Sequence, residues 1–146
     1  MKIFLAQTFY LFTIISMLAW GCKKVDGLAT SPKFDSSHII PKSGIDTIIT
    51  AKNNVNWFFS NIYVGDKSIS FDDPSVKFYT DAITPNSTSD HGPIFRFDGD
   101  WFSIEKIDNK NIRIVIIQNQ SGSERTISFI AQAGDAPNKI HINQQG

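Results

Sequence analysis

The last third of the chain, residues 101–146, constrains the fold most, because it reads as a series of short strands separated by turns. Each run is rich in β-branched or aromatic residues, and each break holds Gly, Asn, Asp, Ser or Pro, which favour turns. The expected strands are Trp101–Lys106, Ile112–Gln118, Arg125–Ala131 and Lys139–Asn143. Strands at this regular spacing predict an antiparallel sandwich rather than alternating strands and helices.

Side-chain alternation within these runs predicts the core. Successive side chains of a strand point to opposite faces, so apolar residues at every second position share one face. The predicted core residues are Ile112, Ile114, Ile116, Ile127, Phe129, Ala131, Ile140 and Ile142. His141 and Asn143 are expected to point away from that core.

The middle of the chain also reads as strands and turns. The expected strands are Ile45–Thr50, Asn56–Val64, Lys67–Phe71, Val76–Thr80 and Ile94–Phe97. Gly65–Asp66 is the expected turn of a hairpin, and Val76–Thr80 is expected to be an edge strand. Residues 81–93 are polar and interrupted by proline, which predicts a loop.

Several short motifs together resemble a known family. They are Trp101–Phe102–Ser103–Ile104, Ile112–Ile114–Ile116, Asn119, Gly122, Arg125, Ile127 and Ile140–Ile142–Gln144–Gly146, with Ser43–Gly44, Ile48–Ile49, Asn53–Asn54 and Trp57 upstream. Over residues 43–146 this pattern resembles the BACON domain, the Bacteroidetes-associated carbohydrate-binding often N-terminal module. It departs from the family at residues 58–99, where the interval between the two tryptophans is enlarged. The resemblance implies an immunoglobulin-like antiparallel β-sandwich of about seven to eight strands, lipid-anchored or fused to surface enzymes, with carbohydrate binding as its role.

The N-terminus has the pattern of a secretory signal. Met1–Lys2 is a short positive region, and residues 3–19 are almost wholly apolar. The stretch that follows resembles a bacterial lipobox and ends at Cys22, the one cysteine of the chain. We therefore expect a signal peptide over residues 1–21, a lipidated Cys22, and a flexible linker over residues 22–42. The alternatives are an uncleaved anchor and an ordinary signal peptide with an unmodified cysteine.

This pattern predicts a membrane-anchored lipoprotein, attached through the acyl chains on Cys22. Two or three acyl chains on one cysteine give stable anchoring, where one chain is marginal. We expect an outer-membrane location facing the cell surface or the periplasm. The 14 Lys and Arg balance the 14 Asp and Glu, and no basic run is present, so a nucleic-acid partner is not expected.

Catalytic and cofactor motifs are not found in the sequence. The three histidines lie apart, without a nucleophile elbow or zinc spacing, and no phosphate-binding glycine loop follows a strand. The aspartates of the turns lack the spacing of a calcium-binding loop. We therefore expect a non-enzyme with no cofactor and no metal. Thr47 lies in an Asp-Thr-Ile pattern that resembles a bacterial O-glycosylation acceptor, but its place inside an expected strand disfavours modification.

Aromatic residues on the expected 56–64 strand supply the candidate binding site. Trp57, Phe59 and Tyr63 share one face at a period of two, and an exposed aromatic face can stack on a sugar ring. The complete set of candidate ligand-binding residues is Trp57, Phe59, Tyr63, Tyr79, Asn86 and Asp90. The expected ligand is a glycan or mucin. The alternative is that these aromatics belong to the core of a structural spacer or of a module that binds a surface protein partner.

Overall fold

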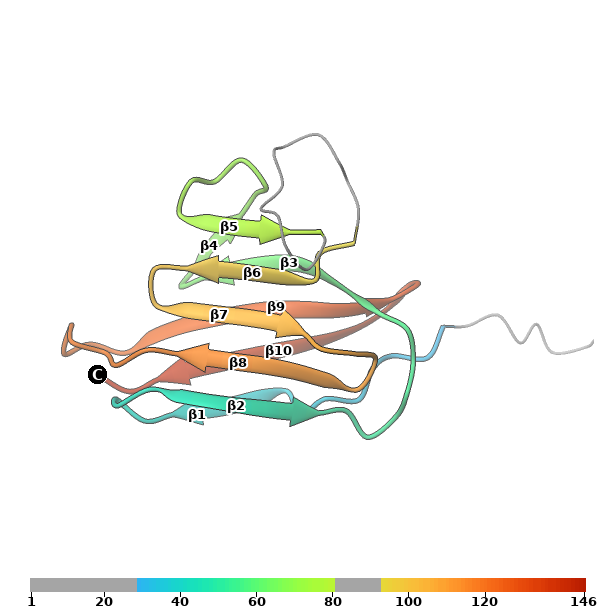
Figure 1. Ribbon diagram of the computed structural model, residues 1–146, viewed down its shortest axis with the longest axis horizontal. Coiled ribbons are helices and arrows are strands. Elements are labelled where there is room, and N and C mark those ends of the chain that lie inside the picture. Colours follow the sequence, from blue (N-terminus) through green and yellow to red (C-terminus); the bar gives the residue numbers. More distant parts are fainter. Residues whose placement is uncertain (1–28, 81–92) are drawn as a thin grey trace, which may run out of the picture.

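A computed structural model describes residues 29–80 and 93–146, which form ten β-strands in two five-stranded sheets packed face to face (Figure 1). The strands are β1 Ser37–Ile40, β2 Ile45–Thr50, β3 Phe58–Val64, β4 Lys67–Ile69, β5 Val76–Tyr79, β6 Arg96–Gly99, β7 Phe102–Lys106, β8 Asn111–Ile116, β9 Arg125–Ala133 and β10 Ala136–Gln144. Sheet A has the order β1-β10-β9-β3-β4, and sheet B has the order β2-β8-β7-β6-β5. The predicted immunoglobulin-like all-β sandwich is confirmed, with ten strands instead of seven to eight.

The core lies between the two sheets, where the predicted alternation is confirmed. All eight apolar residues expected inside from the last third are at most 2% exposed. Three phenylalanines at the centre join the sheets: Phe59 lies 5.1 Å from Phe97 and 5.4 Å from Phe129, and Phe97 lies 5.6 Å from Phe129. These ring pairs are edge-to-face, which suits the positive edge and negative face of an aromatic ring.

The segment expected to be part of a flexible linker belongs to the sandwich. Ser37–Ile40 forms β1, which pairs in parallel with β10 through Ser37 opposite His141. Phe34 and Ile40 are buried, whereas Ile39 points to solvent. The expected linker boundary at residue 42 is therefore wrong, because the domain already includes the described residues before β1.

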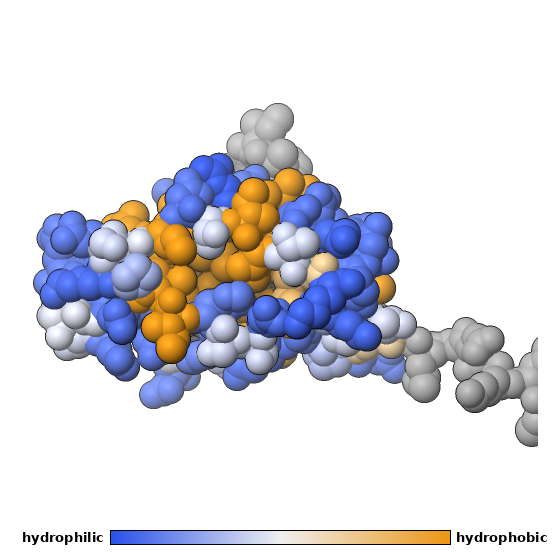
Figure 2. Space-filling view, turned by 90° about the horizontal axis from the view of Figure 1, so that it is seen from below, coloured by the Kyte–Doolittle hydropathy of each residue, from blue (hydrophilic) through white to orange (hydrophobic). Residues whose placement is uncertain are grey.

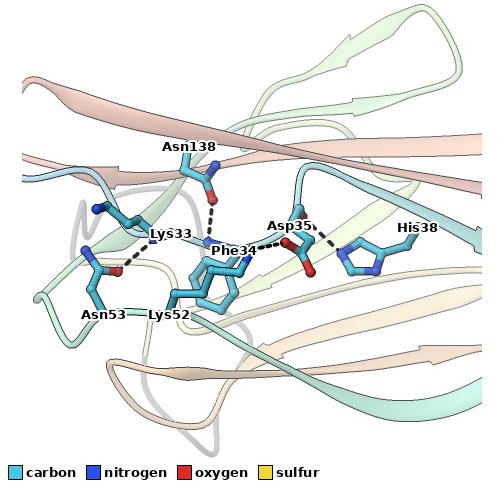
Figure 3. Close-up of polar contacts among 7 residues, drawn as sticks. All are labelled: Lys33, Phe34, Asp35, His38, Lys52, Asn53 and Asn138. Atoms are coloured by element: carbon cyan, nitrogen blue, oxygen red, sulfur yellow. Dashed lines mark hydrogen bonds and ion pairs between the residues drawn. The ribbon is translucent and has the colours of Figure 1, made fainter.

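Polar contacts hold this segment in place (Figure 3). The Phe34 amide donates to Asn138 Oδ1 at 3.1 Å, and the Lys33 amide donates to Asn53 Oδ1 at 2.8 Å. The Phe34 ring packs edge-on against the Trp57 ring at 5.5 Å. The segment thus contributes both a core side chain and backbone hydrogen bonds to the fold.

Three of the residues that carry the family resemblance form a polar cluster at the C-terminus. Gln144 and Asn119 are both fully buried. Arg125 Nε donates to Gln144 Oε1 at 2.7 Å, and Gln144 Nε2 donates to the Ile117 carbonyl at 2.9 Å. Asn119 Nδ2 donates to the carbonyls of Ser123 and Gln145 at 2.7 and 2.9 Å.

This cluster satisfies backbone groups where β8, β9, β10 and the chain before β2 meet. The guanidinium of Arg125 also lies 4.3 Å from the centre of the Trp101 ring, which places a cation over an aromatic face. Buried polar side chains of this kind are costly unless they are hydrogen-bonded, and here each one is. The motif residues Trp101, Asn119, Arg125 and Gln144 therefore serve the fold.

Candidate functional site

A groove lined by aromatic and aliphatic side chains, here called the aromatic groove, lies where the edge of sheet A meets the edge of sheet B. Its floor is closed by an isolated backbone bridge between Phe59 of β3 and Ile94, just before β6. Its volume is about 490 Å³, within the range of small-molecule sites. The lining residues are Phe58, Phe59, Ser60, Asn61, Ile62, Ile69, Phe71, Phe78, Pro93 and Ile94.

Two exposed aromatic side chains stand among the lining residues of this groove. Phe58 is 40% exposed and Phe71 is 46% exposed, although large apolar side chains are usually buried. The Phe71 ring lies 4.9 Å from the ring of the buried Phe78 and packs against it. A partly exposed ring that is held by a packed neighbour, as Phe71 is, offers a rigid flat surface to a ligand.

A β-bulge brings polar groups to the same groove. Ser60 of β3 lies opposite Ile130 of β9, whereas Tyr63 lies opposite Ser128, so β3 carries one extra residue between them. Asn61 occupies the bulge with a φ of 44°, a left-handed conformation that non-glycine residues seldom adopt. Bulges and strained backbone occur preferentially at binding sites, where they redirect side chains. Asn61 is exposed and lines the groove.

The expected aromatic platform of Trp57, Phe59 and Tyr63 is not present. Trp57 and Phe59 are each 2% exposed and belong to the core. The Trp57 indole N–H donates to the Asn109 carbonyl at 2.9 Å, and the Lys106 ammonium lies 4.7 Å from the Trp57 ring centre. Burial lowers the pKa of this lysine. Phe59 still lines the groove, as part of its floor.

Tyr63 points to the opposite side because of the bulge. The extra residue reverses the alternation of β3, so that Ile62 faces the core and Tyr63 faces outward on sheet A. There it joins a row with Ser128 and His141, whose Oγ and Nδ1 atoms lie 2.7 Å apart. The Lys139 ammonium lies 5.4 Å from the Tyr63 ring centre. Tyr63 is therefore separate from the groove.

Tyr79 lies on the outer face of sheet B, where charged side chains form a cross-strand row. The Arg96 guanidinium lies 5.0 Å from the Tyr79 ring centre, and its two nitrogens donate to the Asp98 carboxylate at 2.8 and 2.7 Å. Burial raises the pKa of Tyr79, with a further contribution from the Asp98 charge. Burial alone would raise the pKa of Asp98, but hydrogen bonds from Arg96 and Ser103 outweigh it and lower this pKa.

A second hollow of about 610 Å³ lies beside this row on sheet B. It is lined by Thr80, Phe95, Arg96, Glu105, Lys106, Ile107 and Arg113. Two of its cations are already engaged: Arg96 pairs with Asp98, and Arg113 pairs with Asp46 at 2.7 Å. Because its charges are largely matched within the protein, this hollow offers less to a ligand than the aromatic groove.

The structure brings few of the candidate residues together. Phe59 is the one described candidate in the groove, whereas Trp57, Tyr63 and Tyr79 lie in three other places. Asn86, Asp90 and Cys22 lie outside the described residues. Sequence reasoning missed Phe58, Phe71 and Asn61. Phe58 alternates with Phe59, so it faces away from the core once Phe59 is known to be buried.

Within the described part of the chain, no group of three or more His, Cys, Asp or Glu side chains is placed to hold a metal ion. Across the same residues, no helix has the length and apolar character needed to cross a bilayer.

Comparison with known proteins gives further support to the fold and to no other property. No protein-family model matches the chain, and no curated protein matches it significantly. A solved structure, the NMR structure of the protein from Bacteroides thetaiotaomicron, superposes with a TM-score of 0.58. The two chains share 19% sequence identity, and the match covers 86% of this chain and 95% of the other. At this identity the likeness supports the sandwich fold and carries no functional information.

Proposed function

We propose that this protein is a non-catalytic cell-surface lipoprotein whose BACON-like sandwich binds carbohydrate, or assists a glycan-uptake system, through the aromatic groove. One observation carries the proposal: Phe58 and Phe71 are exposed at a concave site that also holds Asn61. Sugar rings present an apolar C–H face that packs on an aromatic ring, while their hydroxyls need donors and acceptors at the edge. The groove supplies both kinds of contact.

The anchoring part of the proposal rests on the sequence. An apolar leader that ends in a lone Cys22 supports lipid attachment, and a surface lipoprotein meets glycans before they are taken up. On this proposal the ligand is an extracellular glycan or mucin chain, and Cys22 supplies the membrane attachment.

A glycan array probed with the full chain in mild detergent tests the proposal. We expect binding to a subset of plant, microbial or mucin-type glycans, and at least tenfold weaker binding after Phe58→Ala/Phe71→Ala. Phe95→Ala is the matched control, because Phe95 is 39% exposed but lines the sheet B hollow instead. Loss of binding in the Phe95 variant alone would move the site to sheet B. Absence of binding to every glycan would contradict a carbohydrate function.

A second function, that of a protein-interaction module, is favoured by a different observation. Ile39 of β1 and Ile48 of β2 are 73% and 55% exposed, and both strands lie at sheet edges. Exposed isoleucines beside strand edges that no other described strand pairs are suited to a protein partner more than to a sugar.

A further inference from the structure

The outer edge of β2 carries backbone groups that no strand of the described residues pairs. β2 is the first strand of sheet B, and among the described residues only β8 pairs with it. The Ala51 amide donates to the Lys110 carbonyl at 2.7 Å, and this pair continues the β2–β8 register. In an antiparallel ladder, hydrogen-bonded pairs alternate with non-bonded ones. Residues 45, 47 and 49 therefore bond to β8, and the N–H and C=O groups of residues 46, 48 and 50 point to the open edge.

These three residues are complementary to a second copy of themselves. If two β2 strands run antiparallel, Ile48 can lie opposite Ile48, with Asp46 opposite Thr50 on either side. Each of these residues then meets a residue whose backbone groups also point outward, which is the condition for hydrogen-bonded pairs. No carboxylate faces another carboxylate in this register, and each Asp46 is already bonded by Arg113 at 3.0 and 2.7 Å.

Apolar side chains contribute to the surface near this edge. Figure 2 looks from below, the side on which β1 and β2 lie in Figure 1, and shows an apolar area that runs across it. Ile48 is 55% exposed, while Ile45 and Ile49 are partly buried and pack against the core. Edge strands are usually guarded by charge, proline or a covering segment. The charge on β2, that of Asp46, is paired with Arg113 of the same chain, and the residue at the centre of the strand is the exposed Ile48.

We propose that two copies of this protein associate through antiparallel pairing of their β2 strands, with Ile48 of one copy opposite Ile48 of the other. The pairing joins the two five-stranded B sheets into one continuous sheet across a two-fold axis. It also covers Ile45 and Ile49 of each copy. The aromatic groove lies at the other edge, beside β4 and β5, so the dimer presents two grooves on one particle. A glycan chain with repeated units then binds with the advantage of bivalency.

Site-directed disulfide trapping tests the register. In the full chain with Cys22→Ser, kept in mild detergent, Ile48→Cys is oxidised and resolved on a non-reducing gel. Hydrogen-bonded antiparallel pairs have Cα atoms about 5.5 Å apart, which suits a disulfide. Thr50→Cys is the matched control, because the two Thr50 residues are about 14 Å apart in this register. We expect at least tenfold more covalent dimer for Ile48→Cys than for Thr50→Cys. The Asp46→Cys/Thr50→Cys double variant should again form the covalent dimer, because its two cysteines lie opposite each other in this register.

The remaining outcomes separate the alternatives. Ile48→Lys should make the protein monomeric in chemical cross-linking without changing its circular dichroism, since the side chain is exposed. Lys77→Cys, on the opposite edge strand, reports random collision within a micelle. Equal trapping at Ile48, Thr50 and Lys77, or a wild-type chain that stays monomeric, would overturn the proposal. If β2 instead pairs with a strand of a different protein, the wild-type chain will stay monomeric in this experiment. Glycan binding by the Ile48→Lys monomer would leave the carbohydrate function intact.

Discussion

Removing the Gln144 side chain tests how much the buried C-terminal cluster stabilises the sandwich. Gln144 is fully buried, accepts a hydrogen bond from Arg125 and donates to Ile117. Its Nε2 also lies 3.3 Å from the carbonyls of Pro41 and Lys42. A hydrogen bond to a charged group is worth about 1.5–3 kcal/mol and a neutral one about 1 kcal/mol. Counting the two long contacts as one weak bond, we expect Gln144→Ala to cost about 3–5 kcal/mol.

The assay is urea denaturation of the full chain in mild detergent, followed by tryptophan fluorescence. A loss of this size is a large part of the stability of an ordinary domain, about 5–15 kcal/mol, so the midpoint should move strongly. Gln145→Ala is the control, because the neighbouring side chain is exposed. Gln144→Glu should be at least as damaging at pH 7, since a carboxylate cannot donate to the Ile117 carbonyl. If Gln144→Ala costs no more than Gln145→Ala, the reasoning about this cluster is refuted.

Three further predictions follow from the core, the backbone and the charges. Trp57→Ala should destabilise by about 3–5 kcal/mol in the same assay, as loss of a buried aromatic does; near-wild-type stability would mean the ring is not in the core. Gly44 has a φ of 86° and an added Cβ would overlap the Ile116 carbonyl, so Gly44→Ala should cost more than Gly65→Ala, whose φ is 60° with open space around it. The pKa of Asp98 is lower in the folded state than its unfolded value of about 3.8. The ionised Asp98 carboxylate therefore stabilises the fold above that pH, and this stabilisation is lost as the pH falls through the folded-state pKa. The stability lost between pH 7 and pH 2 should therefore be smaller for Asp98→Asn, and an unchanged loss would contradict this account.

The strands of the last third could be predicted because local alternation determines them. Ile112, Ile114 and Ile116 face inward for the same reason that their polar neighbours face outward. β1 could not be found this way, since it is a short strand that pairs with β10, more than a hundred residues further along the chain. Ile40 is its one buried apolar residue, which is too few for a periodic pattern.

The candidate site was predicted poorly for two physical reasons. A period-two reading assumes an uninterrupted strand, and the single extra residue at Asn61 turns Tyr63 away from Phe59. The groove itself joins the edges of two sheets, so Phe58 and Phe71 line the same groove because of tertiary packing that no local pattern contains. Lipidation at Cys22 remains a prediction, as do the roles of Asn86 and Asp90.

An NMR titration of the isotopically labelled full chain with its tightest array glycan tests the central claim most directly. The account predicts that the largest shifts occur at the backbone amides of Ser60, Asn61 and Phe71, with saturation at a single dissociation constant. The amide resonances of His141 and Arg96, two residues whose side chains lie on the outer faces of the sheets, should not shift. Shifts concentrated on either outer face, with the groove amides unmoved, would contradict the account.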